Sequence, residues 1–223
     1  MRYSDGVIRI NIAPLAALSA LCLFSATPVA QTWQFDNVTK IGGHRATALG
    51  HPHVIRTQKG KAIEFNGADD ALFLDVHPLA GAETWTWEVI FRPDAGGSPE
   101  QRFFHLQEDG SDNRMLFEIR LTGHEWCLDS FAKSGDASLA LMDRQKLHPA
   151  GAWYHAAAVY DGHEFRNYVD GVLENKGELK LAPQKPGRTS IGVRINKVNY
   201  FKGAVREARM TPRALSVSEF LKK

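Results

Sequence analysis

Residues 152–171, AWYHAAAVYDGHEFRNYVDG, constrain the fold more than any other stretch of this sequence. An apolar run, 154–160, is followed by the pair Asp161-Gly162 and by an alternating run, 164–170. Asp-Gly between two such runs indicates a β-hairpin, because a type I′ turn needs positive φ at both central residues and Asp and Gly tolerate it best. The stretch therefore predicts two antiparallel strands joined by a tight type I′ turn.

Residues 84–94, TWTWEVIFRPD, alternate in the manner of a half-buried strand. The expected core face holds Trp85, Trp87, Val89 and Phe91. The opposite face holds Thr86, Glu88, Ile90 and Arg92. Similar patterns predict strands at residues 31–38, 60–66, 72–74, 102–107, 114–121, 125–131, 137–142, 188–194 and 200–211, whereas 39–53 reads as irregular. Since the only helical pattern is a short tail at 215–221, the chain is expected to be all-β, a two-sheet antiparallel sandwich.

The first thirty residues have the three-part pattern of a secretory signal peptide. Arg2 and Arg9 make the start basic, residues 10–24 are almost wholly apolar, and residues 25–30 are mostly small. The pattern predicts export to the periplasm or the extracellular space, with cleavage near Ala30. An uncleaved anchor is disfavoured, because the apolar run is shorter than the ~20 residues that a membrane-spanning helix needs.

Cleavage would leave residues 31–223, which suits one β-rich domain. The formal net charge would fall from +2 to +1, because the signal carries Arg2, Arg9 and Asp5. This near-neutral balance argues against a nucleic-acid partner, whose phosphates require a basic face. Cys127 would then be the remaining cysteine, so the stability of the domain is expected to come from its core rather than from a disulfide.

Three segments resemble the pattern of laminin-G-like jelly rolls in the concanavalin A-like lectin and glucanase superfamily. They are GKAIEFNGADDALFL with TWTWEVIFRPD, the hairpin AWYHAAAVYDGHEFRNYVDGVL, and FKGAVREARMTPRALSVSEF at residues 201–220. The resemblance implies a jelly-roll sandwich over residues 31–223. It also implies a family of carbohydrate binders, adhesion modules and a minority of glycosidases and polysaccharide lyases. A fold shared by so many functions does not by itself name a ligand.

Some members of that family bind calcium, an ion that takes several hard oxygen ligands. Asp69, Asp70 and Glu207 are the candidate ligands here. Arg206 stands where the last strand of the family commonly carries Asp, and its charge opposes a cation at that position. A polar turn also accounts for Asp69 and Asp70. Calcium is thus the one cofactor for which the sequence offers ligands.

The catalytic signatures of the family are missing from this sequence. Its glucanases carry Glu-x-Asp-x-Glu on one strand, so that period-two spacing brings the carboxylates to one face. Here the strands at 84–92 and 116–121 offer one carboxylate each, Glu88 and Glu118. A lyase needs a base and a cation. Parts of that kind are His105, Arg120, His124 and Tyr154. Recognition without catalysis is therefore favoured, with a carbohydrate-active enzyme and a protein-binding adhesion module as alternatives.

The outward sides of the predicted strands are expected to form one polar surface with aromatic members. Such a surface suits a glycan or cell-surface polysaccharide, because sugar hydroxyls pair with charged groups and the apolar face of a sugar stacks on a ring. Its predicted members are Glu88, Arg92, Arg102, His105, Glu118, Arg120, Trp126, Asp129, Arg194, Asn196 and Tyr200. In the hairpin, Tyr154 and His155 are the candidates for function, since Trp153 and the run 156–159 are predicted to lie in the core.

Overall fold

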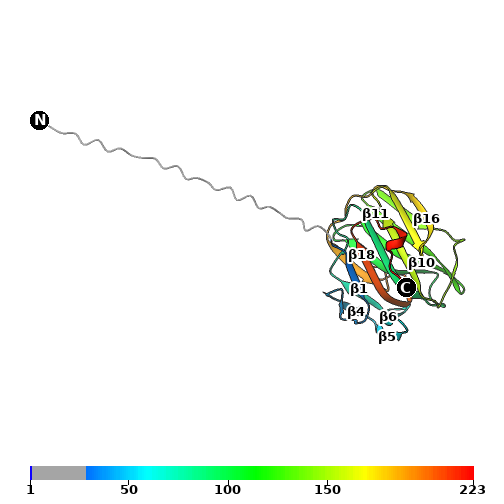
Figure 1. Cartoon of the computed structure of the whole chain (residues 1–223). Helices are drawn as coiled ribbons and strands as arrows, with labels where there is room; N and C mark the ends of the chain where they lie inside the picture. Colours follow the sequence, from blue (N-terminus) through cyan, green and yellow to red (C-terminus); the bar gives the residue numbers. More distant parts are fainter. Residues whose placement is uncertain (2–28) are drawn as a thin grey trace.

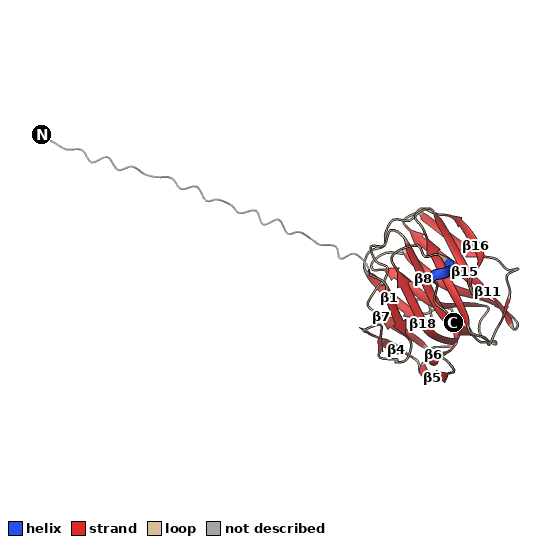
Figure 2. Cartoon of the chain, viewed as in Figure 1, coloured by secondary structure: helices blue, strands red, loops and turns tan. Residues whose placement is uncertain are grey.

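The computed structural model describes Met1 and residues 29–223, so nearly all of the predicted signal peptide lies outside the described residues. Two eight-stranded antiparallel sheets face each other across a common core. In the part of the chain that the structure describes, the one helical element is a single 3₁₀ turn, η1 (Val217–Glu219) (Figure 2). The prediction of an all-β, two-sheet sandwich is confirmed.

One sheet, called sheet 1 below, contains the hairpin. Its strands follow the order β16 (Val172–Glu178), β15 (Glu164–Val169), β14 (Tyr154–Tyr160), β8 (Trp85–Pro93), β18 (Lys202–Thr211), β6 (Gly60–Asn66) and β5 (His53–Thr57). Figure 1 labels β16, β18, β6 and β5 of this sheet. β1 (Gln31–Gln34) also pairs with β18, along the half of that strand that β6 does not reach.

The opposite sheet, sheet 2, carries most of the middle of the chain. Its order is β12 (Ala137–Met142), β11 (Glu125–Ser134), β10 (Arg114–Thr122), β9 (Glu100–Glu108), β17 (Gly187–Ile191), β7 (Ala71–Leu74) and β4 (Thr47–Leu49). β13 (His148–Pro149) pairs with one end of β11. β2 (Lys40–Ile41) and β3 (His44–Arg45) form a separate two-stranded ribbon.

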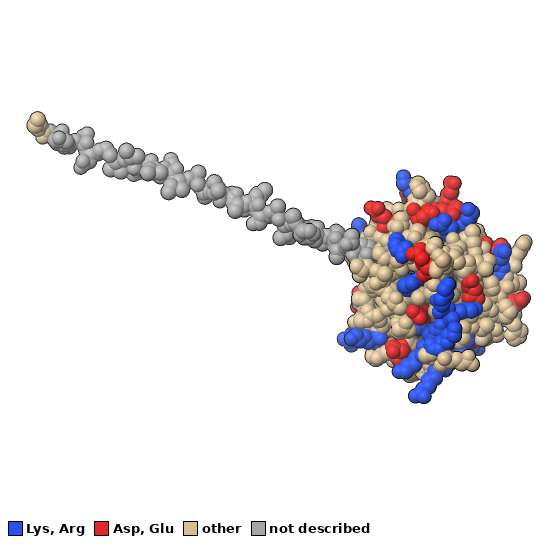
Figure 3. Space-filling model, in the orientation of Figure 1, with Lys and Arg blue, Asp and Glu red and all other residues tan. Residues whose placement is uncertain are grey.

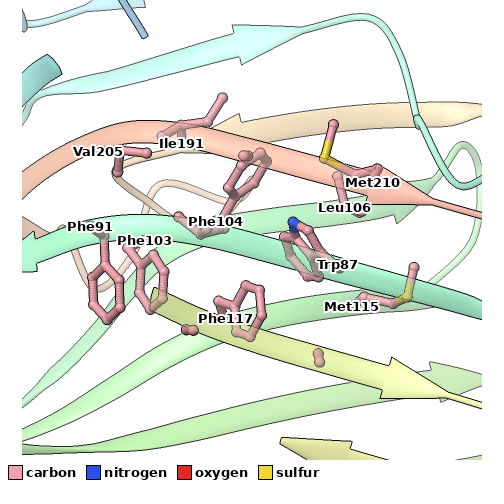
Figure 4. Packing of buried hydrophobic residues seen from close by; sticks show 14 of the residues in the cluster. Trp87, Phe91, Phe103, Phe104, Leu106, Met115, Phe117, Ile191, Val205 and Met210 are labelled. Carbon is pink, nitrogen blue, oxygen red and sulfur yellow. The ribbon is translucent and has the colours of Figure 1, made fainter. Parts of the chain in front are cut away.

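Aromatic rings from both sheets fill the space between them (Figure 4). Phe91 of β8 stacks on Phe103 of β9 with ring centroids 4.2 Å apart, and Trp87 lies 4.3 Å from Phe117 of β10. Removing one such buried ring costs about 3–5 kcal/mol of stability, since the cavity does not refill. This interdigitation fixes which side chains of each strand point outward.

The outer side of β8 is covered rather than half-buried, so that prediction is wrong. Thr86, Glu88 and Ile90 have no exposed surface. The chain after β18 folds back over this side, and its Leu215 and Phe220 form a small second apolar cluster on sheet 1. The predicted helical tail shortens to η1, which does have the predicted capping box.

The hairpin of β14 and β15 is confirmed, but its predicted turn type is wrong. Its loop has three residues, of which only Gly162 has positive φ. Asp161 instead stabilises the loop with its side chain, which accepts the backbone N–H groups of the next two non-glycine residues at 3.0 and 2.8 Å. The pair of positive φ values expected of a type I′ turn occurs at Asp170 (49°) and Gly171 (79°), between β15 and β16.

Two further stretches differ from the sequence-based expectation. The segment 39–53 is not irregular throughout, because β2, β3 and β4 lie within it. β6 and β7, which flank the Asn66-Gly67 turn, belong to different sheets. The two strands were predicted, and the chain crosses from sheet 1 to sheet 2 at the turn between them.

Candidate functional site

The predicted site residues do not form one surface. Glu88, Arg92 and His155 belong to strands of sheet 1, while Arg102 and Glu118 belong to strands of sheet 2. The core lies between the two groups, so they occupy opposite outer sides of the sandwich. Alternation along a strand tells which side chains point outward, but it does not tell to which sheet the strand belongs.

Glu88 is a buried structural carboxylate. Its Oε1 bonds with His155 Nε2 at 3.0 Å and accepts the backbone N–H of Leu221 at 2.7 Å, and its Oε2 accepts Arg209 Nε at 2.6 Å. Burial opposes ionisation, but these three bonds outweigh it and lower the pKa of Glu88. Glu88 and His155 thus tie the C-terminal segment to sheet 1, and their predicted ligand contacts are replaced by contacts within the protein.

Trp126 and Tyr154 lie in the core, with exposed fractions of 0% and 8%. Trp126 and Asp129 were both predicted to point outward. This is wrong, because residues three apart on a strand point to opposite faces. Trp126 packs against Phe91 and Tyr154, and the hydroxyl of Tyr154 donates to the carbonyl of Pro149 at 2.8 Å.

The outer face of sheet 2 brings the remaining charged candidates together. Glu118 of β10 lies directly opposite Asp129 of β11 on one side and Arg102 of β9 on the other. Arg120 follows two residues after Glu118 and therefore shares its face. We call this set, which consists of Arg102, Glu118, Arg120 and Asp129, the arginine–carboxylate cluster.

Each carboxylate of the cluster contacts an arginine. Arg120 Nη2 lies 2.6 Å from Asp129 Oδ2 and 3.2 Å from Glu118 Oε2, while Arg102 Nε lies 3.1 Å from the same Glu118 oxygen. Arg120 Nη1 reaches Glu100 Oε1 at 2.7 Å. Strand pairing fixes the backbone under all these groups, so the cluster presents N–H donors and carboxylate oxygens in a set geometry.

The two carboxylates differ in their surroundings. Burial and the neighbouring charge of Asp129 raise the pKa of Glu118, although the two arginines act in the opposite direction. Glu118 and Asp129 are only 5% and 3% exposed. A carboxyl group with a raised pKa that lies beside a second carboxyl group is an arrangement used in acid catalysis, so it bears on the choice of function.

Sequence reasoning missed an aromatic residue on this face. Phe131 lies two residues after Asp129 on β11 and is half-buried, and the guanidinium of Arg114 stands 4.7 Å from its ring centroid. Strict alternation from the core positions of β11 would have identified Phe131, because Trp126 and Leu128 face inward. Phe131, rather than Trp126, is the aromatic residue on this face.

His105 lies on β9 of sheet 2, opposite Leu116 of β10, and it is fully buried. Its Nδ1 accepts the backbone N–H of Ile195 at 3.0 Å, which places the ring proton on Nε2. Burial and then Arg194 lower the pKa of His105 to about 3, so the ring is neutral. The loop after β17 that covers it also holds the predicted residues Arg194, Asn196 and Tyr200.

The three predicted calcium ligands are not brought together. Asp70 accepts backbone N–H groups from His51 and Asn66 at 2.6 and 3.0 Å, as a turn carboxylate does. Glu207 lies five residues further along β18 than Lys202, the partner of Asn66, or about 16 Å along an extended strand. Within residues 29–223, no group of three or more metal-binding side chains is found. Calcium binding at Asp69 and Asp70 stays a prediction, under which added calcium raises the melting temperature and a chelator reverses the rise.

A family model described as concanavalin A-like lectin/glucanases superfamily, of the laminin-G type, matches residues 66–220. The chain belongs to this superfamily. The resemblance found in the sequence is thereby confirmed, and the family match covers the arginine–carboxylate cluster. Among curated proteins, no relative matches the chain. In the described part of the chain, no helix is long and apolar enough to cross a membrane.

Solved structures share the fold of this superfamily member at low sequence identity. Domain 4 of the extracellular arabinanase AbnA from Geobacillus stearothermophilus, in complex with arabinotriose, is 18% identical with a TM-score of 0.58; the match covers 85% of this chain and 94% of that domain. The binding domain of Paraclostridial Mosquitocidal Protein 1 is 11% identical with a TM-score of 0.62, over 85% of this chain. The botulinum neurotoxin serotype D binding domain is 11% identical with a TM-score of 0.58, also over 85%. The chain spans about half the length of these two toxin domains.

Proposed function

We propose that this chain is an exported, non-catalytic module that binds a saccharide on the outer face of sheet 2. The observation that carries the proposal is the arginine–carboxylate cluster beside Phe131, two residues away on the same side of β11. The arabinotriose complex of AbnA domain 4 supports it, because that domain has the same fold. Export rests on the predicted signal peptide and agrees with the extracellular origin of that neighbour.

The chemistry of the face suits sugar hydroxyls. A hydroxyl group both donates and accepts, and the cluster places arginine N–H donors next to carboxylate acceptors. Hydrogen bonds to charged groups are worth about 1.5–3 kcal/mol each, more than bonds between neutral groups. Phe131 adds a ring against which the apolar side of a sugar can pack. Because the charges are already paired with each other, a neutral saccharide can bind without leaving one of them unpartnered.

Two of the candidate bases for a lyase reaction, His105 and Tyr154, are occupied within the fold. His105 holds its proton on Nε2 and accepts at Nδ1 from the backbone, so neither nitrogen is free to take a proton. The hydroxyl of Tyr154 donates to a carbonyl, and burial raises its pKa. His155 bonds to Glu88. His124 is exposed in the turn between β10 and β11, at the end of the sheet.

One observation favours a second candidate, a retaining glycoside hydrolase. Glu118 and Asp129 are direct cross-strand neighbours, and Glu118 has the raised pKa expected of a general acid. In this alternative Glu118 protonates the leaving group and Asp129 is the nucleophile. We favour binding, because Asp129 Oδ2 accepts both Arg120 Nε and Arg120 Nη2, at 2.9 and 2.6 Å, which leaves that oxygen poorly placed to attack a sugar.

A panel of polysaccharides and oligosaccharides separates the two. Binding is measured by calorimetry, and turnover by the appearance of reducing ends and of the ultraviolet absorbance of an unsaturated uronide. The proposal expects saturable binding without product. Product that disappears in Glu118→Gln would establish the hydrolase instead. A panel without any binding would overturn both and leave the adhesion class.

The location of the site is tested by two variants. We expect Phe131→Ala to weaken binding about two- to twelvefold, from the loss of one stacking contact of about 0.5–1.5 kcal/mol. The matched control is Leu173→Ala, which removes an exposed apolar side chain from β16 on the other sheet. Equal losses in both variants, or none in either, would contradict a site on sheet 2.

A further inference from the structure

A pocket of about 570 Å³ opens on the side of the molecule that carries sheet 1. Figure 3 shows lysine and arginine side chains gathered over β5, β6 and the C-terminal end of the chain. The pocket lies in this basic area, and it contains no acidic residue in its lining. The lining residues that carry the argument are Arg56, Lys59, Arg92, Trp153, Arg206 and Lys223.

Arg206 reaches the pocket through an irregularity of β18. The pairing of β18 with β8 shifts register between Val205 and Glu207, so that Arg206 is an extra, bulged residue. The bulge coincides with the change of partner on the other edge of β18, from β6 to β1. A bulge turns a side chain away from the regular alternation and is therefore a means of aiming it into a site.

Arg206 is nearly buried as a residue, and its guanidinium has no acidic partner. Only 6% of the residue is exposed, and its guanidinium carbon lies 5.5 Å from the ring centroid of Trp153. Within the described residues, no carboxylate lies within 4.0 Å of Arg206. Burial lowers its pKa, although the residue remains charged because arginine titrates far above neutral pH. A buried cation without a partner is costly, so such a group is a natural site for an anion.

Most other cations of the pocket are already engaged. Arg92 bonds to Glu64 and Asp94 at 2.7–2.8 Å. The ammonium group of Lys223 bonds to Asp170, and that of Lys59 bonds to the main-chain oxygen of Lys223, the last residue of the sequence. Arg206, together with the exposed Arg56 at the end of β5, is left to recognise a ligand. Trp153, which the sequence predicted to be core, is half-buried here, between Arg206 and Arg92.

We infer that this pocket binds an oxyanion, namely the carboxylate or sulfate group of an acidic saccharide. A guanidinium recognises such a group with two parallel N–H bonds, which gives both affinity and orientation. The saccharide part rests on the proposed function of the chain, whereas the anion site rests on Arg206 alone. The pocket lies across the core from the arginine–carboxylate cluster, so the module would bind one acidic glycan at two separate surfaces or two glycans at once.

Trp153 provides a direct reporter for this pocket. The protein has five tryptophans, of which Trp33, Trp85, Trp87 and Trp126 are at most 4% exposed. A ligand at the pocket should therefore change the fluorescence of Trp153 alone. The probes are a tetramer of galacturonate, a chondroitin sulfate tetrasaccharide and the neutral arabinotriose. We expect both acidic probes to change the fluorescence saturably, the neutral one not to, and Trp153→Phe to lack the change.

Two substitutions test the residue that carries the inference. Arg206→Met keeps an apolar side chain against Trp153 but removes the charge, and we expect it to weaken acidic probes about ten- to hundredfold. Arg45→Met removes an exposed arginine from β3, outside the pocket, and is the matched control. Arg56→Gln, at the exposed end of β5, tests the site even where Arg206→Met does not fold, with an expected loss of about two- to fivefold.

Each outcome bears on the inference. Equal affinity for acidic probes in wild type, Arg206→Met and Arg45→Met would overturn it, as would a fluorescence change that survives Trp153→Phe. The saccharide assignment would be overturned if anionic lipid vesicles or single-stranded DNA bound more tightly than the acidic saccharides and lost this binding in Arg206→Met. Loss of arabinotriose binding in Phe131→Ala with acidic binding intact would separate this pocket from the site on sheet 2, so the two proposals can fail independently.

Discussion

Replacing Glu88 by Gln should destabilise the protein without affecting its ligand binding. Glu88 was a natural candidate for a sugar contact from its sequence, yet it has no exposed surface. The substitution keeps the size of the side chain and an oxygen that can accept the N–H of Leu221. It removes the charge that Arg209 and His155 bond to at 2.6 and 3.0 Å.

The expected loss follows from those two bonds. Hydrogen bonds to a charged group are worth about 1.5–3 kcal/mol each. Breaking a buried ion pair from one side costs about 3–5 kcal/mol, because the other charge is left without its partner. The first route gives about 3–6 kcal/mol and the second about 3–5 kcal/mol, so we expect a loss of about 3–5 kcal/mol for Glu88→Gln. For a domain of this size, that loss lowers the melting temperature by about 6–20 °C.

Two measurements at neutral pH test this loss. Urea unfolding gives the free energy of unfolding, and scanning calorimetry gives the melting temperature. The matched control is Glu125→Gln, an exposed carboxylate at the start of β11, where we expect a change within about 0.5 kcal/mol. Saccharide affinity should be the same for both variants and the wild type. A Glu88→Gln protein as stable as the control, or one that is stable but no longer binds sugar, would refute the structural role of Glu88.

Two other predictions concern pH and backbone space. The pKa of Glu88 is lowered below its ordinary value of 4.5, so the unfolded state takes up the proton first as the pH falls. The free energy of unfolding should therefore fall as the pH drops below about 4.5. Glu88→Gln should lose this part of the acid sensitivity, and identical acid profiles of the variant and the wild type would contradict the prediction. Gly203→Ala should lower the free energy of unfolding by about 3 kcal/mol or more, because a Cβ there would lie 2.1 Å from the carbonyl oxygen of Arg92. Gly135 has open space around it and a φ of +60°, so Gly135→Ala should lower it by only about 1 kcal/mol in the same urea assay. Equal losses in the two variants would contradict the close packing of β18 on β8.

The sequence predicted the fold well because the relevant signals are local. Alternation in residues 84–94 identified the core face of β8, and Asp161-Gly162 identified the hairpin even though the turn differs in type. Turn type was harder to predict, since the side chain of Asp161 stabilises a three-residue loop that its sequence does not distinguish from a two-residue one.

The candidate site was predicted only in part, because it depends on pairing between distant strands. Glu118 and Asp129 become neighbours through the β10–β11 register, which the sequence does not specify directly. Glu88 was assigned to the same surface because nothing local reveals that β8 and β10 belong to opposite sheets. Covering of Glu88 by the C-terminal segment is likewise a tertiary effect.

Trp153 was predicted to lie in the core, but it lines a pocket together with Arg206. The hairpin pattern suggested a core position for Trp153, since a tryptophan next to an apolar run is usually buried. The bulge at Arg206 changes the outward alternation of β18 and brings both residues to one pocket. A bulge carries no reliable sequence signal when no glycine marks it, so this pocket becomes visible only in three dimensions.

The central claim, that a saccharide binds on the outer face of sheet 2, is tested most directly by a crystal structure of the protein with the tightest neutral oligosaccharide of the panel. The account predicts a sugar ring packed against Phe131, with its hydroxyls within hydrogen-bond distance of Arg120 or Glu118. A sugar bound to the loops at either end of the sandwich, or on the side of sheet 1, would contradict it.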